Sequence, residues 1–194
     1  GAVTGIAAQN RFEVVVKGTA SHAGTTTMQL RRDAMAGAAE MIMAVETIAN
    51  DLGGDLVATV CRIELSPGST NVVAREVSFS LDVRSGGMTH RDTATRAMRD
   101  ELERIAIRRG LALEMTTLQD LASSPCDKGL TDLHDTAMER AGHPRRALVS
   151  GAGHDAMVMS ELCPTAMLFV RCAGGGSHNP AEQVTIADTQ AALD

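Results

Sequence analysis

The sequence contains no tryptophan and no tyrosine, and its only phenylalanines are Phe12, Phe79 and Phe169. A nucleic-acid interface needs basic stripes with interleaved aromatic side chains, whereas the formal net charge of this chain is -6. We therefore expect no nucleic-acid partner. The core must be filled mainly by alanine, valine, leucine and 11 methionines.

Long apolar runs are also missing from the chain. No stretch approaches the roughly 20 residues that a membrane-spanning helix needs, and no signal peptide opens the sequence. The cysteines are scattered without a Cys-x-x-Cys pair, at Cys61, Cys126, Cys163 and Cys172. In a chain of 194 residues this pattern indicates reduced thiols. The predicted setting is cytoplasmic, without a membrane partner.

Residues 1–120 alternate between strand and helix patterns. Phe12, Val14 and Val16 alternate with other residues and predict a strand with one mostly buried face. Thr89 and Asp92 suggest a capping box for a helix that ends at Gly110. The other predicted elements are a helix over about 28–50 and strands over 56–65, 76–84 and 111–115. This β-α-β-β-α-β order is the ferredoxin-like split motif, about 115 residues long.

A linker-like segment over 122–125 separates this part from residues 121–194. The second part predicts helices over about 128–141, 151–162 and 186–193, with short strands over 146–149 and 165–170. So few short strands rarely form a free-standing sheet. The fold class is therefore α+β, with domains over 1–120 and 121–194, and we expect the other half of the second domain to precede Gly1.

Several polar residues that could take part in catalysis or binding lie where predicted strands end. His178 lies in a Gly-rich loop and suits a metal or anion site, although a surface histidine is an equally open interpretation. Gly151 and Gly153 lie beside His154 in a turn that is predicted to open a helix, where free backbone N–H groups favour an anion. In the alternative interpretation the turn is purely structural, with Asp155 as a helix cap and His154 exposed to solvent.

Three further polar residues, His22, Asn71 and Arg84, also fall near strand ends. They could converge on one edge of the sheet, where an arginine could bind a carboxylate in a bidentate manner. From the residues alone, three unrelated surface positions are at least as plausible.

Six segments, in order, carry a resemblance to a known family. They are 3–7 (VTGIA), 21–26 (SHAGTT), 67–72 (PGSTNV), 81–85 (LDVRS), 150–156 (SGAGHDA) and 177–182 (SHNPAE). Together they resemble the hydantoinase and carbamoylase branch of the M20 metallopeptidase clan, which includes N-carbamoyl-L-amino-acid hydrolase and allantoate amidohydrolase.

The resemblance implies an architecture. Members have an α/β zinc-hydrolase catalytic domain with two divalent ions, which can be Zn, Mn, Co or Ni, and an inserted ferredoxin-like lid that also dimerises. Residues 1–120 would be the lid and dimerisation domain. Residues 121–194 would be the C-terminal part of the catalytic domain. The implied partners are a second copy of the chain and a small ureido or carbamoyl substrate that carries a carboxylate.

The resemblance also implies roles for single residues. His178 matches a metal ligand. His22 matches a catalytic residue that polarises the scissile carbonyl, while Asn71 and Arg84 match residues that bind the substrate carboxylate, some of them in the site of the partner subunit. Gly151 and Gly153 match backbone contacts to substrate.

Two local departures from the family pattern are Thr27, where a proline is common, and Ala74-Arg75, where Pro-Gly is usual. The larger departure is that the other metal ligands and the acidic general base have no counterpart here. This chain alone is therefore expected to bind no metal tightly and to be inactive. The alternative function is a non-catalytic module for substrate binding or dimerisation. A dipeptidase-like member of the clan fits the motifs less well.

Overall fold

The computed structural model describes residues 1–193, and these fall into two compact units. The central unit is Ala8–Ala122. The terminal unit combines Gly1–Ala7 with the chain from Ser123 onward. Both units mix helices with strands, so the α+β class is confirmed.

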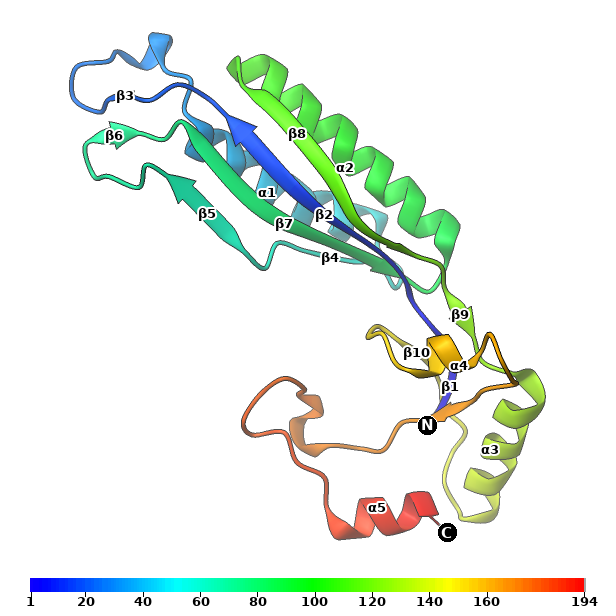
Figure 1. Ribbon diagram of the computed structural model, residues 1–194. Coiled ribbons are helices and arrows are strands. Elements are labelled where there is room, and N and C mark those ends of the chain that lie inside the picture. The colour runs from blue at the N-terminus through cyan, green and yellow to red at the C-terminus, as the bar shows by residue number, and fades with distance from the viewer. Residues whose placement is uncertain (194) are drawn as a thin grey trace. The chain divides into compact units, whose positions relative to one another are not determined.

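The central unit is built on an antiparallel sheet in which the long strands β2 and β7 lie side by side (Figure 1). Ala8 of β2 pairs with Ser85 of β7, and Lys17 pairs with Glu76 at the other end. The strand order is β4-β7-β2-β8, and β5 also pairs with β7. The strands are β2 (Ala8–Lys17), β4 (Val57–Thr59), β5 (Ile63–Ser66), β7 (Glu76–Ser85) and β8 (Ala112–Leu121).

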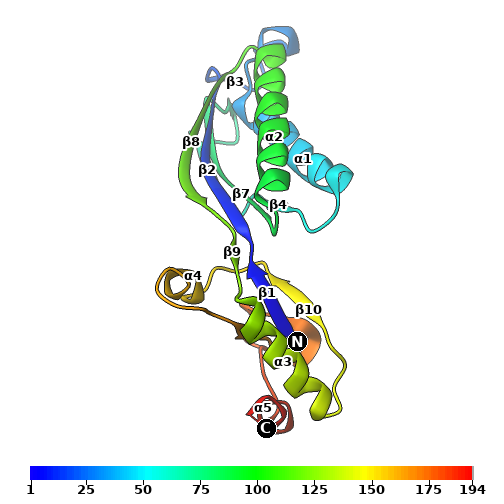
Figure 2. The ribbon, with the colours of Figure 1, turned by 90° about the vertical axis from the view of Figure 1, so that its right-hand side faces the viewer.

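Two helices, α1 (Ala34–Leu52) and α2 (Met88–Arg109), cover one face of this sheet (Figure 2). The core lies between them and the alternate residues of the strands, because successive side chains of a strand point to opposite faces. On β7 the buried set is the predicted one, with Val77, Phe79, Leu81 and Val83 fully buried. On β7 the other face carries the polar residues of the strand, which are Glu76, Ser78, Ser80, Asp82 and Arg84.

The ends of both helices depend on specific residues. The Asp33 carboxylate accepts hydrogen bonds from the backbone N–H groups of Met35 and Ala36, so α1 begins at Ala34, and Met28–Leu30 is a separate turn of 3-10 helix, η1. Gly110 adopts a left-handed conformation after α2, as predicted. The capping box of Thr89 was wrong, because the N-cap residue is Gly87 and no side chain caps the helix.

A short ribbon lies beyond the end of β2 and the start of β7 (Figure 1). It pairs β3 (Ser21–His22) with β6 (Val72–Val73), so that His22 lies opposite Val72. The ribbon therefore brings two distant segments of the sequence together at one end of the central sheet.

The terminal unit is organised around β1 (Ala2–Ile6). This strand pairs in parallel with β10 (Ala147–Ser150) and antiparallel with both β11 (Met167–Leu168) and β9 (Ser124–Pro125). The remaining elements of the unit are the helices α3 (Lys128–Arg140), α4 (Ala156–Met159) and α5 (Ile186–Leu193) and the 3-10 turn η2 (Ala173–Gly175). Large apolar side chains such as Val149, Val158 and Leu162 are exposed here.

The division of the chain differs from the predicted domains 1–120 and 121–194 at the N-terminus. Residues 1–7 belong to the terminal unit because β1 forms its ladder with β9, β10 and β11. The second boundary lies between Ala122 and Ser123. Across residues 1–193, none of the helices is long and apolar enough to cross a membrane. All four cysteines are free thiols.

Candidate functional site

Arg84 lies near the end of β7, on the sheet face that the helices leave uncovered. Its neighbours Val83 and Ser85 are buried, and strand alternation directs Arg84 to the opposite face. The Asp82 carboxylate, two residues earlier on the same face, accepts hydrogen bonds from Arg84 Nε at 2.7 Å and from Nη2 at 3.0 Å. This two-point contact fixes the plane of the guanidinium.

Asp82 also joins Arg84 to the neighbouring strand β2. Its Oδ2 atom accepts hydrogen bonds from Gln9 Nε2 at 2.7 Å and from Arg11 Nε and Nη2 at 3.0 and 2.9 Å. Burial raises the pKa of the Asp82 carboxyl, but the hydrogen bonds from Arg84, Arg11 and Gln9 outweigh burial and hold that pKa below its usual range. Two guanidinium groups around one carboxylate leave a net positive charge, which suits an anion.

The depressed pKa predicts how Asp82 contributes to stability. Ionised Asp82 stabilises the fold fully above the unfolded pKa of about 3.9, and this contribution is lost as the pH falls through the lower folded pKa. Asp82→Asn cannot titrate, so its urea midpoint should fall less than that of the wild type between about pH 5 and pH 2. Asp51→Asn, at an exposed position, is the control and should follow the wild type. Parallel curves for wild type and Asp82→Asn would contradict the assignment.

His22 and Asn71 lie together at the other end of the central sheet. The backbone N–H of Ala23 donates to the carbonyl oxygen of Asn71 at 2.9 Å, in the ribbon that pairs β3 with β6. Both His22 and Asn71 are exposed. The imidazole Nδ1 of His22 accepts a hydrogen bond from the backbone N–H of Gly24 at 3.0 Å.

The expected convergence of His22, Asn71 and Arg84 on one edge was therefore wrong. Asn71 precedes the first residue of β7, whereas Arg84 lies beside Gln9 at the start of β2. Glu76 and Arg84 are eight positions apart along β7, which is about 27 Å at roughly 3.4 Å per residue. The three residues thus form two groups at opposite ends of the sheet.

Gly151 and Gly153 form a tight turn after β10. The buried hydroxyl of Ser150 donates to the carbonyl oxygen of Ala152 at 2.9 Å and lies 2.9 Å from Nε2 of His154. This contact closes the turn, and the helix predicted over 151–162 is reduced to α4. A Cβ atom added at Gly151 would meet nothing within 4 Å, so local packing gives no reason for glycine there.

His178 lies on an exposed loop with a left-handed backbone, at φ 55°. Few residues other than glycine adopt this conformation, and such strain is concentrated at functional sites. The backbone N–H of His178 donates to Glu182 Oε2 at 3.0 Å. Among residues 1–193, no three histidine, cysteine, aspartate or glutamate side chains gather into a metal-binding group. These residues on their own do not fit the two-ion centre that the family resemblance implies.

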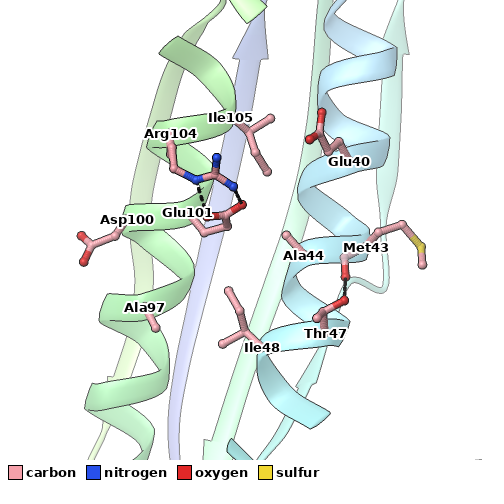
Figure 3. A pocket seen from close by; sticks show the side chains of 10 residues that line it. All are labelled: Glu40, Met43, Ala44, Thr47, Ile48, Ala97, Asp100, Glu101, Arg104 and Ile105. Atoms are coloured by element: carbon pink, nitrogen blue, oxygen red, sulfur yellow. Dashed lines mark hydrogen bonds and ion pairs between the residues drawn. The ribbon is translucent and has the colours of Figure 1, made fainter. Parts of the chain in front are cut away.

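The network around Asp82 was missed by sequence reasoning, which singled out Arg84 alone. The pattern Asp82-Val83-Arg84 was a usable local signal, since residues two apart on a strand share a face. Gln9 and Arg11 carried no such signal, because their proximity to Asp82 depends on the register of β2 against β7. None of the predicted site residues lines the groove of about 600 Å³ between α1 and α2 (Figure 3).

Comparisons with known proteins agree on the family to which this chain is similar. The family model described as Peptidase family M20/M25/M40 matches residues 6–194. The N-carbamoyl-L-amino acid amidohydrolase of Geobacillus stearothermophilus is 38% identical over 188 residues, which cover 97% of this chain and 46% of that protein. The probable allantoate deiminase of Oryza sativa subsp. japonica is 35% identical over 221 residues, covering 99% of this chain and 45% of that protein.

Solved structures agree as well. A hydantoinase/carbamoylase family amidase from Burkholderia multivorans has a TM-score of 0.92 at 35% identity, covering 98% of this chain and 46% of that chain. AtUAH in complex with glyoxylate has a TM-score of 0.91 at 29% identity, covering 100% of this chain and 46% of that chain. The chain thus spans less than half the length of these relatives. From the family match over residues 6–194, the chain belongs to the peptidase family M20/M25/M40.

Proposed function

We propose that this chain supplies part of the active site of an amidohydrolase, which hydrolyses the linear amide or ureido C–N bond of N-carbamoyl amino acids or allantoate. The observation that carries the proposal is the Arg84 guanidinium, which Asp82 orients, with Arg11 as a second guanidinium on the same carboxylate. Both substrates carry a carboxylate, which an oriented guanidinium binds in a bidentate manner. Relatives named for these two activities support the reaction class.

In this proposal each candidate residue has one task. Arg84 binds the substrate carboxylate, and Asn71 adds an amide donor. His22 donates a hydrogen bond to the scissile carbonyl oxygen as negative charge develops on it. The turn at Gly151 and Gly153 offers backbone groups without side-chain obstruction.

His178 is proposed as one ligand of a metal centre whose other ligands lie outside these 194 residues. A structural or catalytic zinc site needs three or four protein ligands, so His178 cannot form one alone. The left-handed backbone of His178 supports the assignment, because strained conformations of this kind are concentrated at functional sites.

The central unit is proposed as the ferredoxin-like lid, with the terminal unit as the C-terminal part of the catalytic domain. The β-α-β-β-α-β order and the antiparallel arrangement β4-β7-β2-β8 support the first assignment. The exposed apolar side chains of the terminal unit support the second, because large exposed apolar surface is commonly an interface. A further part of the catalytic domain would cover them in the full-length protein.

A homodimer is proposed because one chain cannot place all the candidate residues around one small substrate. About 27 Å of β7 separates Arg84 from the ribbon of His22 and Asn71, which is much longer than an N-carbamoyl amino acid. A second copy could supply the missing end to each site. The groove between α1 and α2 offers a contact surface, with Met43, Ala44 and Ile48 among its lining residues (Figure 3).

Replacing Arg84 by lysine in the full-length protein tests the carboxylate contact. Lysine keeps the charge but loses the planar fork, and hydrogen bonds to charged groups contribute about 1.5–3 kcal/mol. We expect kcat/KM for an N-carbamoyl amino acid to fall roughly ten- to a hundredfold. Steady-state assays of ammonia release provide the measurement.

The matched substrate for this test is an analogue in which a neutral amide replaces the carboxylate. Arg84→Lys should change its hydrolysis by less than about twofold, because the analogue has no negative charge for the fork to bind. Equal losses on both substrates would show that Arg84 supports the fold and does not bind the carboxylate.

The second candidate function is a non-catalytic module for substrate binding or dimerisation. The observation that favours it is the absence of a metal-binding group among residues 1–193. Activity of the full-length protein with N-carbamoyl amino acids or allantoate would exclude this alternative.

A further inference from the structure

The turn that follows β3 determines which nitrogen of His22 can carry a proton. Gly24 N–H donates to Nδ1 of His22 at 3.0 Å, so the lone pair of Nδ1 is engaged as an acceptor. A neutral imidazole has one donor nitrogen and one acceptor nitrogen. With Nδ1 accepting, the proton of the neutral ring must be on Nε2. The opposite tautomer would place two hydrogens against each other.

Arg31 holds this turn from a second side. Its guanidinium donates from Nε to the carbonyl oxygen of Thr26 at 3.0 Å and from Nη2 to the carbonyl oxygen of Ala23 at 2.5 Å. The N–H of Thr26 also donates to the carbonyl oxygen of His22 at 3.1 Å. The carbonyl groups on both sides of Gly24 are thus anchored, and the direction of the Gly24 N–H is fixed with them.

We infer that Gly24 and Arg31 are positioning residues, which hold His22 as the Nε2–H tautomer and make it a hydrogen-bond donor toward an acceptor oxygen. The identity of that oxygen, the carbonyl of a ureido or amide substrate, rests on the proposed function. The tautomer itself rests only on the contacts of this turn. A base at this position would need an unprotonated Nε2, which the hydrogen bond from Gly24 disfavours.

Nitrogen NMR of the 194-residue chain labelled with 15N-histidine tests the tautomer directly. Spectra are recorded at about pH 8.5, because the tautomer is a property of the neutral ring. The His22 signals are assigned by their loss in His22→Gln. We expect a pyridine-type shift at Nδ1 and a pyrrole-type shift at Nε2, whereas exposed His143 should show the mixture of a free imidazole. A His22 spectrum like that of His143, or one with the proton on Nδ1, would overturn the inference.

Variants of the turn separate positioning from general stability. Gly24→Pro removes the N–H and should move His22 toward the mixture, whereas Gly24→Ala keeps the N–H and should leave the shifts unchanged. The alanine Cβ would lie 3.4 Å from His22 Cε1, an ordinary contact. Arg31→Met should also move His22 toward the mixture. Arg32→Met is its control, because that side chain lies near Gly110. Unchanged shifts in both Gly24→Pro and Arg31→Met would contradict the inference.

Activity of the full-length protein connects the tautomer to the reaction. Gly24→Pro should lower kcat by roughly tenfold with little change in KM, because a donor to the developing oxyanion acts in the transition state. Gly24→Ala should stay within about twofold of wild type. If the NMR result holds but no ureido or amide substrate is hydrolysed, the proposed function is wrong and the tautomer assignment stands. A wild-type kcat in Gly24→Pro despite the altered tautomer would refute the catalytic role.

Discussion

Purified alone, the 194-residue chain should release no ammonia from N-carbamoyl amino acids or allantoate, with or without added Zn, Mn, Co or Ni. His178 is its single proposed metal ligand, and residues 1–193 contain no metal-binding group of three suitable side chains. A divalent ion activates water only when enough ligands hold it beside the substrate. The expected loss is complete, because the residues proposed here orient substrate but do not generate the nucleophile.

The control for this experiment is the full-length protein, assayed with the same metals and substrates. It should be active when the isolated chain is not, and circular dichroism should show that the isolated chain is folded. Metal-dependent turnover by the purified 194-residue chain would contradict the proposal that the groups that generate the nucleophile lie outside this chain.

Parts of the fold were predictable where local signals were strong. The alternation of Val77, Phe79, Leu81 and Val83 gave β7 and its buried face, because the period of two is a property of the strand itself. Gly110 gave the end of α2 for a similar reason, since a left-handed residue suits glycine. The capping aspartate Asp33 was also a local signal, and it was overlooked in favour of one long helix.

Other parts depend on contacts between distant residues. The strand predicted over 56–65 is interrupted because the N–H groups of Cys61 and Arg62 donate to the side chain of Ser80. The start of α2 was misplaced because the Asp55 carboxylate accepts a hydrogen bond from Gly86, while the Asp92 side chain contacts Arg91. The contacts of Ser80 and Asp55 join residues 18 to 31 positions apart, so no sequence pattern within one element predicts them.

The candidate site shows the same division between local and distant information. The residues were selected through motifs, but their grouping depends on the pairing of β2 with β7 and of β3 with β6. In an antiparallel pair, the end of one strand lies beside the start of the next. Asn71 therefore lies beside His22 and not beside Arg84, although Arg84 is the nearer of the two in the sequence, at only 13 positions from Asn71.

This grouping predicts that two inactive variants of the full-length protein can restore each other. His22→Gln and Arg84→Ala should each abolish most activity. If each active site takes Arg84 from one subunit and His22 from its partner, a mixed dimer contains one site with both residues intact. Equal mixing gives about half mixed dimers, so about a quarter of all sites should recover in a symmetric dimer.

The experiment mixes the two full-length variants under conditions of subunit exchange and measures kcat per site. A control pair of variants distinguishes complementation between opposite ends of the central sheet from a general effect of mixing two variants. His22→Gln with Asn71→Ala changes the same end of the sheet in both chains, so neither site of their mixed dimer receives an intact end. Recovery by the first pair without recovery by the second would support the shared site. If mixed dimers form and the first pair stays inactive, His22 and Arg84 do not serve one site across two subunits. Because about 27 Å of β7 separates the two residues within one chain, one of them would then be excluded from substrate contact.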